Sequence, residues 1–365
     1  MKIAEIIAQL ELVAHPSLQE AYDNAGLITG SAGWVCTGAI ICLDATEAVI
    51  NEAAEKNYNL VIAHHPIVFS GLKKINGNNY VEKAIIAAIK KDVAVYAIHT
   101  NLDNVSSGVN GMMAAKLGLV NTSILLPRAD TFKKLYVFVP IQQAAQVRDA
   151  IFAAGGGAIG NYSECSFNTS GTGTFKAEEG AQPFVGERGK QQQENEVRVE
   201  VIFPAWAEKE LIAAMKKAHP YEEVAYDVLS LDNPHPGIGS GTIGELPETM
   251  DENSFLSRVK QVFQTPIIKH TALTGKPVKR VAVCGGAGSF LISHAARAGA
   301  VFYISSDIKY HEFFDANDRL VIADIGHYES EQFTIDLLAG VLQEKFPTFA
   351  ALKTAVKTNP VNYFL

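Results

Sequence analysis

Two hydrophobic patterns alternate along the first part of the chain: apolar residues at helical spacing, and short continuous apolar runs. The helical spacing predicts helices at residues 2–14, 46–56, 81–91 and 109–117. The apolar runs between them predict strands at residues 35–43, 60–63 and 93–98. Strands that alternate with helices of this length are typical of a layered α/β domain.

A different pattern begins near residue 128. Apolar and polar residues alternate at 134–140 and 196–204, as they do in half-exposed antiparallel strands. Helices are predicted at 143–154 and 207–219, and a further strand at 225–231. We interpret this part as a ferredoxin-like plan of strand, helix, strand, strand, helix, strand. Residues 155–189 are rich in Gly, Ser, Thr and Asn, and the composition of 232–244 predicts a linker.

The α/β pattern returns from residue 245. Strands are predicted at 278–284, 300–305 and 320–325, and helices at 289–298 and 330–345. The sequence therefore predicts a discontinuous α/β domain formed by residues 1–127 and 245–365. An inserted α+β domain at 128–244 interrupts it.

Composition narrows the class of protein. The chain has 365 residues, 48% of them hydrophobic, and a net charge of −8 without basic runs. This charge argues against a sequence-independent nucleic-acid binder. The N-terminus lacks the apolar core of a signal peptide, and no apolar stretch reaches the roughly 18 residues of a membrane span. We therefore expect a cytoplasmic protein without a membrane partner.

The four cysteines, at positions 36, 42, 165 and 284, form no C-x-x-C pair. Zinc-ribbon and thioredoxin-like sites are thereby excluded. Isolated cysteines in apolar strands are typical of reduced, buried residues of an intracellular protein.

Two adjacent histidines, His64 and His65, follow the apolar run 60–63 and precede Pro66. Neutral imidazole is the commonest metal ligand in proteins. Because neighbouring residues of an extended chain point to opposite sides, the two rings would serve two metals more readily than chelate one. Two ordinary loop histidines are the alternative that the pair alone leaves open.

Asp103, His327 and Glu331 also follow predicted strands. His327 and Glu331 are four residues apart, so they share one face of a helix. A turn or cap residue is the structural alternative for Asp103, and an acid-rich first helical turn is the alternative for the other two. Ligand sites form at the carboxyl ends of such strands. With the histidine pair, these residues are enough to hold two divalent ions.

A second cluster, Asp307, Lys309 and His311, follows the strand at 300–305. These residues could support the ligands or move protons, or they could be a helix cap and solvated polar residues. The nearby turn Gly285–Gly288 lacks a complete G-x-G-x-x-G pattern, which disfavours a dinucleotide site. A tight turn, or a wall of the metal cleft, explains it better.

Two further polar groups could lie near the cleft. One is the turn Tyr22–Leu27, and the other is Asp44 with Thr46 after the strand at 35–43. Capping explains both groups equally well.

These segments resemble the signature blocks of the Nif-three-like family, whose members are often labelled GTP cyclohydrolase I type 2 homologues. The blocks cover essentially the whole chain in the family's order, and Tyr22 stands where many members have tryptophan. They are Tyr22–Leu27, His64–Pro66, His99–Asp103, Asp307–His311 and Gly326–Glu331. The insert, with Gly160–Ser163 and Ala218–Glu223, resembles the PII/CutA-like module of longer bacterial members.

The resemblance implies a two-metal site formed by His64, His65, Asp103, His327 and Glu331. It suggests His65 with Asp103 on one ion, His64 with His327 on the other, and Glu331 as the bridge. It also implies a toroidal homohexamer. Histidine with carboxylate suits several metals, and we expect two zinc, iron or manganese ions per subunit.

Two functions follow as hypotheses. The first is a metal-dependent hydrolase of the cyclohydrolase type, acting on a nucleotide-like small molecule. In it, two ions would activate water, and His311, Asp307 or Lys309 would move protons. The second is a metal-binding regulator or metal chaperone without enzymatic activity, whose insert senses a metabolite or a partner.

Overall fold

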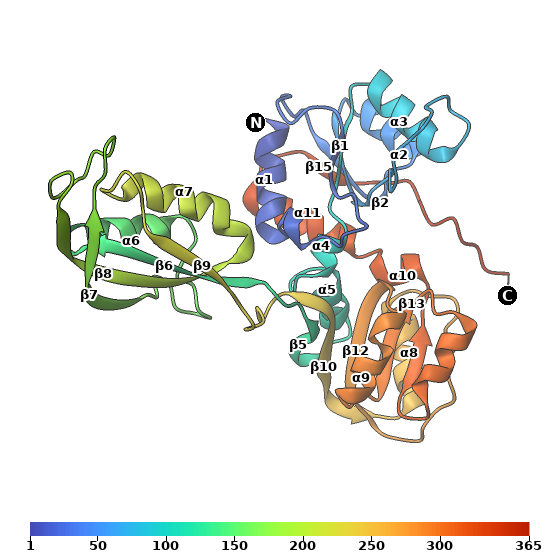
Figure 1. The fold of residues 1–365 in the computed structure, drawn as a ribbon. Coiled ribbons are helices and arrows are strands. Elements are labelled where there is room, and N and C mark those ends of the chain that lie inside the picture. Colours follow the sequence, from blue (N-terminus) through green and yellow to red (C-terminus); the bar gives the residue numbers. More distant parts are fainter. Residues whose placement is uncertain (365) are drawn as a thin grey trace. The chain divides into compact units, whose positions relative to one another are not determined.

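The computed structural model describes residues 1–364, which divide into two compact units (Figure 1). The discontinuous unit comprises Met1–Pro127 and the chain from Pro236 onwards. The inserted unit comprises Arg128–His235. Each unit has its own hydrophobic core.

The first sheet of the discontinuous unit has the strand order β1-β4-β3-β2-β15. Its strands are β1 (Gly26–Thr29), β2 (Ala39–Asp44), β3 (Leu60–His65), β4 (Ala94–Ala97) and β15 (Ala351–Lys353). All neighbours are parallel except β1. Helices α2 (Glu47–Glu55) and α3 (Tyr80–Lys90) pack on one face, and α11 (Thr334–Lys345) also contacts β2. Helix α1 (Ile3–Val13) packs against α11.

The second sheet has the order β11-β14-β13-β12-β10-β5. Its strands are β5 (Val120–Pro127), β10 (Gly239–Met250), β11 (Lys269–His270), β12 (Val278–Ala287), β13 (Phe302–Ser306) and β14 (Val321–Asp324). The neighbouring pairs β12–β13 and β13–β14 are parallel, and the other neighbouring pairs are antiparallel. One face packs on helices α5 (Val109–Lys116) and α8 (Glu252–Val262), and the other packs on α9 (Ile292–Arg297).

Short helices follow the carboxyl ends of the parallel strands in both sheets. Helix α4 (Thr100–Asp103) follows β4, and α10 (His327–Glu331) follows β14. Gly326, at φ +91°, permits the turn into α10, because only glycine adopts this conformation freely. The closing helix expected at 330–345 is therefore two helices, α10 and α11.

The inserted unit has the order of elements β6, α6, β7, β8, α7 and β9. Their bounds are β6 (Phe132–Pro140), α6 (Ala144–Ala153), β7 (Phe167–Lys176), β8 (Gln191–Pro204), α7 (Glu208–Ala218) and β9 (Tyr226–Leu231). The antiparallel sheet has the order β7-β8-β6-β9, which confirms the ferredoxin-like plan. The helices cover one face, where Val137 and Val199 meet Val147 and Leu211.

Strand β7 lies in the stretch 155–189, for which we predicted no element. Its residues are almost all exposed, so burial imposes no apolar pattern on them. Backbone pairing with β8 along its whole length holds it in the sheet instead.

The linker predicted at 232–244 is wrong, because strand β10 begins at Gly239. The unit boundary accordingly falls at residue 235 rather than 244. The glycines that indicated a linker serve close strand pairing: a Cβ on Gly239 would lie 2.2 Å from the carbonyl oxygen of Leu126 in β5. Composition alone does not distinguish this use of glycine from flexibility.

All four cysteines are free thiols; Cys42 and Cys284 are buried, whereas Cys36 and Cys165 are partly exposed, contrary to the expected burial. Within residues 1–364, no helix is long and apolar enough to cross a membrane.

Candidate metal centre

The structure brings all five predicted metal ligands into one cluster between the two sheets of the discontinuous unit. His64 and His65 end β3, and Asp103 ends α4. His327 and Glu331 are the first and last residues of α10, and both α4 and α10 are labelled in Figure 1. The cluster therefore joins residues more than 260 positions apart, as in the contact of His65 with Glu331.

Two groups of ligand atoms share Glu331. In the first, His64 Nε2 lies 3.7 Å from Asp103 Oδ1 and 3.9 Å from Glu331 Oε1. In the second, Glu331 Oε2 lies 2.9 Å from His65 Nε2 and 3.1 Å from His327 Nε2. This grouping differs from the pairing that the family resemblance implies: His64 lies with Asp103, and His65 lies with His327. Side chains of neighbouring strand residues diverge, and the surrounding helices decide which partner each one meets.

The first group fits a metal ion for a specific reason. His64 Nε2 and Asp103 Oδ1 are buried and have no hydrogen-bond partner. Leaving a buried polar atom unpaired costs about 1–3 kcal/mol. Ligand bonds of about 2.1 Å place two ligand atoms of one ion at most about 4.2 Å apart. The distances of 3.7 and 3.9 Å satisfy that limit, so a divalent ion would supply the missing partner.

Each of the three ligand histidines is oriented through its Nδ1 atom, which leaves Nε2 facing the centre. The Nδ1 atoms of His64, His65 and His327 contact the carbonyl oxygen of Ile98 at 2.9 Å, Asp44 at 2.8 Å and Asp307 at 2.7 Å, respectively. Such outer hydrogen bonds fix the tautomer and the ring orientation of a ligating histidine. Asp44 thus orients a ligand, whereas Thr46 caps helix α2.

His99 is a fourth histidine at the centre, and the sequence analysis did not single it out. One of its ring nitrogens lies within 4.8 Å of ligand nitrogens of His64 and His65. Its Nδ1 lies 2.8 Å from Asp23, which also accepts the backbone N–H of Thr100. The position of His99 directly after a strand, like that of His64, was the available signal.

Buried hydrogen bonds to carboxylates shift the pKa values of two ligands. Burial opposes the charged form of His65, but its bonds to Asp44 and Glu331 raise its pKa to about 9. Burial likewise opposes the charged form of His327, and its bonds to Asp307 and Glu331 raise its pKa to about 11. Without a metal, both rings are therefore protonated at neutral pH.

In the group of His64, Asp103 and Glu331, burial decides the pKa shifts of the first two residues. Burial lowers the pKa of His64, so its ring is neutral. Burial, with the nearby charge of Glu331, raises the pKa of Asp103 well above its usual range. Burial also opposes the charge of Glu331, but its close contacts with the His327 and His65 rings hold its pKa well below the usual range.

The turn Gly285–Gly288 forms a wall of the centre. Gly286 has φ +63°, and a Cβ there would lie 2.4 Å from Glu331 Oε1. Its N–H donates to Ser330 Oγ at 3.0 Å. The glycine thus leaves room for the shared carboxylate, which explains the GGxG pattern without a dinucleotide.

The three residues of the second predicted cluster occupy different positions. Asp307 contacts His327, as described above. Lys309 and His311 are exposed near the start of the short helix η5 (Tyr310–Ala316). In the described part of the chain, no hydrogen bond or ion pair joins either side chain to the five ligands, and the ring of His311 packs between Tyr310 and Phe314.

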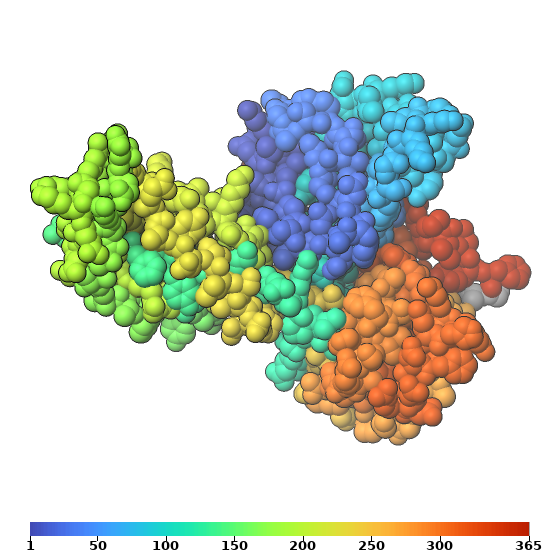
Figure 2. Space-filling model, in the orientation of Figure 1, coloured from blue at the N-terminus to red at the C-terminus, as the bar shows by residue number. Residues whose placement is uncertain are grey.

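The C-terminal segment also contacts residues that surround the ligands of the candidate centre. Thr358 Oγ1 donates to Asp44 Oδ2 at 2.7 Å, on the carboxylate whose other oxygen meets His65. Asn359 lies 3.3 Å from Glu329 of α10. Figure 2 shows this segment, in red, at the surface beside residues of both sheets.

Comparisons with known proteins give a family model, relatives and a solved structure that match most or all of the chain. The family model described as Duf34/NIF3 (NGG1p interacting factor 3) matches residues 1–360. A protein named GTP cyclohydrolase 1 type 2 homolog from Halalkalibacterium halodurans is 38% identical over 371 residues, covering 100% of both chains. Its namesake from Bacillus subtilis is 42% identical over 308 residues, covering 84% of this chain and 83% of the relative. The crystal structure of a Bacillus cereus protein related to NIF3 matches with a TM-score of 0.86 at 38% identity, over 100% of this chain and 99% of that one.

Proposed function

The chain belongs to the Duf34/NIF3 family, and we propose that it is a two-metal hydrolase acting on a nucleotide-like small molecule. The observation that carries the proposal is the pair of unpartnered buried atoms on His64 and Asp103, beside a carboxylate shared with a second ligand group. The relatives named GTP cyclohydrolase 1 type 2 homolog support a substrate of the nucleotide class.

We propose that His64, Asp103 and Glu331 hold one ion, and that His65, His327 and Glu331 hold the other. His99 would be a further ligand or a neighbour. Two adjacent divalent ions supply Lewis-acid activation of water and of the substrate's oxygen atoms. Zinc, iron and manganese all suit these ligands.

The exposure of the side chains around the centre indicates the side from which substrate would enter. The His64 side chain is fully buried, whereas those of His327 and Asp307 are 40% and 52% exposed. Substrate would therefore enter on the His327 side. There the carboxylate of Asp307, held ionised because the hydrogen bond to His327 lowers its pKa, would orient the His327 ring and accept hydrogen bonds from solvent or substrate. Lys309 and His311, both exposed near the start of helix η5, are candidates for binding an anionic group of the substrate.

The test uses full-length protein stripped of metal and reloaded with Zn²⁺, Mn²⁺ or Fe²⁺. Metal content is measured, and activity is assayed on GTP and on panels of phosphoesters and cyclic amides. Two ions per subunit, and hydrolysis that is lost in Glu331→Gln but kept in the exposed-surface control Glu344→Gln, would support the proposal. Full metal loading with no hydrolysis of any panel member would contradict the enzyme and favour a metal-binding regulator or chaperone.

We also propose the homohexamer that the family resemblance implies. Light scattering coupled to size-exclusion chromatography should give six times the 39.4 kDa chain mass. A monomeric mass at micromolar concentration would contradict it.

A further inference from the structure

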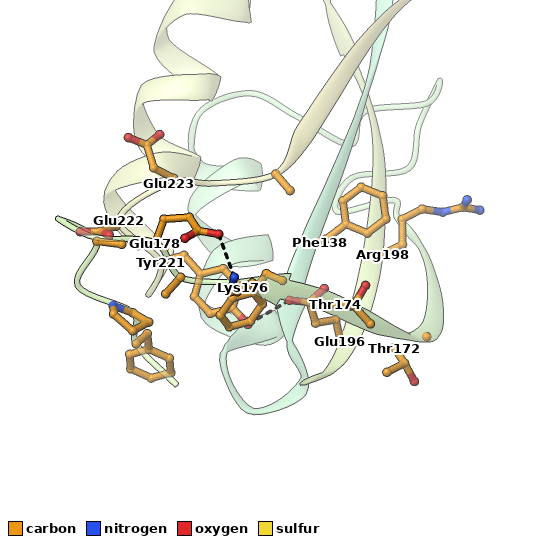
Figure 3. Close-up of a pocket in the computed structure, with 18 of the residues that line it drawn as sticks. Phe138, Thr172, Thr174, Lys176, Glu178, Glu196, Arg198, Tyr221, Glu222 and Glu223 are labelled. Carbon is orange, nitrogen blue, oxygen red and sulfur yellow. Dashed lines mark hydrogen bonds and ion pairs between the residues drawn. The ribbon is translucent and has the colours of Figure 1, made fainter. Parts of the chain in front are cut away.

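A cavity of about 630 Å³ lies in the inserted unit and is lined only by residues of that unit (Figure 3). It lies against β7 and two loops, 177–190 and 219–225. Cavities of this volume hold small molecules. We propose that it binds an organic cation, in which an ammonium, amidinium or guanidinium group is attached to a small apolar body. This inference is independent of the metal centre.

The floor of the cavity is the sheet face that α6 and α7 do not cover. In the strand register, Gly171 pairs with Glu196, and Phe138 pairs with Arg198. Directly paired residues point to the same face, so these side chains share the floor. A Cβ on Gly171 would meet no atom within 4 Å, so this glycine leaves the floor open.

Aromatic rings form one wall. The centroid of Tyr221 lies 6.1 Å from that of Phe175 and 6.2 Å from that of Phe184. Phe138 contributes a further ring to the lining, and Figure 3 shows it beside Arg198. Aromatic faces attract cations through their negative electrostatic potential, most strongly where water is excluded.

A buried carboxylate supplies the matching charge. Glu196 is 8% exposed, and its Oε1 accepts a hydrogen bond from Tyr221 Oη at 2.9 Å (Figure 3). Within residues 1–364, no lysine, arginine or histidine forms an ion pair with Glu196. A buried charge without an opposite partner is costly, and a cationic ligand would relieve that cost.

His219 does not supply the missing positive charge, although it lies near Glu196. Its Nε2 donates to the carbonyl oxygen of Phe138 at 2.9 Å, and its Nδ1 accepts the N–H of Tyr221 at 3.1 Å. This arrangement requires the neutral ring. Burial also lowers the pKa of His219.

The other charged side chains that line the cavity disfavour an anionic ligand. Lys176 pairs with Glu178 at 3.4 Å, and Arg198 pairs with Glu200 at 2.7 Å. Both cations of the lining are thus neutralised by neighbours. The lining carries four carboxylates, namely those of Glu178, Glu196, Glu222 and Glu223, against two cations, Lys176 and Arg198. This excess of negative charge disfavours a phosphate-bearing or carboxylate ligand.

The experiment titrates the full-length protein with four probes of similar size in a calorimeter: benzyltrimethylammonium, benzamidine, benzyl alcohol and benzoate. We expect both cations to bind, the neutral alcohol to bind about tenfold more weakly or less, and benzoate not to bind. Glu196→Gln should weaken cation binding about tenfold, and Phe184→Ala should weaken it about threefold to tenfold. Glu210→Gln makes the same charge change on an exposed residue of α7 and should leave binding unchanged.

A second variant keeps Glu196 intact. Gly171→Leu should fill the floor and abolish cation binding while the circular-dichroism spectrum and the oligomeric mass stay unchanged. Three results would each overturn the proposal. They are equal binding of cation and alcohol, unchanged binding in Glu196→Gln, and no cation binding to the wild-type protein. A change of oligomeric mass in Gly171→Leu would also overturn it, because the cavity would then be an interface between copies.

Discussion

The two halves of the metal centre satisfy their buried polar atoms in different ways. In the half formed by His64 and Asp103, one buried atom of each residue has no hydrogen-bond partner. In the half formed by His65 and His327, every ring nitrogen contacts a carboxylate. Glu331 belongs to both. Protonated histidines can therefore satisfy the contacts of the second half, whereas His64 and Asp103 leave room for a further partner such as a metal ion.

The largest effect should come from Glu331→Gln, which removes the anionic oxygen from both halves at once. We expect metal content to fall from two ions per subunit to near zero, because the remaining ligands of each half carry little negative charge. Plasma emission spectrometry of dialysed protein measures this. Retention of one ion would show that the halves bind independently of their shared carboxylate.

Substituting one carboxylate in each half tests the two halves separately. Asp103→Asn removes a direct ligand, so the first ion should be lost. Asp307→Asn removes only the partner of a ligand histidine and should weaken the second ion about 10–100-fold. Competition with a chromogenic chelator measures both affinities.

The variants Asp103→Asn and Asp307→Asn should also differ in the thermal stability of the metal-free protein. Burial favours the neutral form of Asp103, so Asp103→Asn should keep or raise the melting temperature of the metal-free protein. Asp307→Asn should lower it, because His327 loses a charged partner. Equal shifts in the two variants would contradict the distinction between the halves.

The second half should give the metal-free protein a characteristic pH dependence. The folded pKa values of His65, about 9, and His327, about 11, lie above the usual histidine value of 6.5. Their stabilisation is fully present below pH 6.5 and is lost as pH rises through 9 and then 11. The melting temperature in chelator should therefore fall between pH 7 and 10.

Two controls sharpen this measurement. Loading with metal should flatten the profile, because bound imidazoles are already deprotonated. His65→Gln should also make the decline shallower. A profile that is unchanged in that variant would assign the titration to other groups.

The smallest effect should come from Thr358→Val. It removes the hydroxyl that donates to Asp44, two contacts away from the second ion. We expect a loss of metal affinity of a few-fold in the second half only, measured in the same chelator competition. Thr358→Ser keeps the donor and should restore wild-type affinity. An effect on the first ion would show coupling between the halves that the contacts do not explain.

Residues that close strands were the most predictable part of the site. His64 and His65 end the apolar run of β3, Asp103 lies one short helix beyond β4, and the spacing of His327 and Glu331 places both on one face of α10. Strand β7 and the start of β10 were not predictable, because exposed or glycine-rich strands lack an apolar period.

The sequence by itself determined the ligand types, the alternation of helices and strands in the discontinuous unit, and the ferredoxin-like plan of the insert. These follow from local periodicity and from the chemistry of single side chains. Only the tertiary structure decided that His64 groups with Asp103, that Asp44 and Asp23 hold histidines, and that Glu196 is buried beside Tyr221. Such pairings depend on contacts between distant segments, whose distances and burial no local pattern encodes.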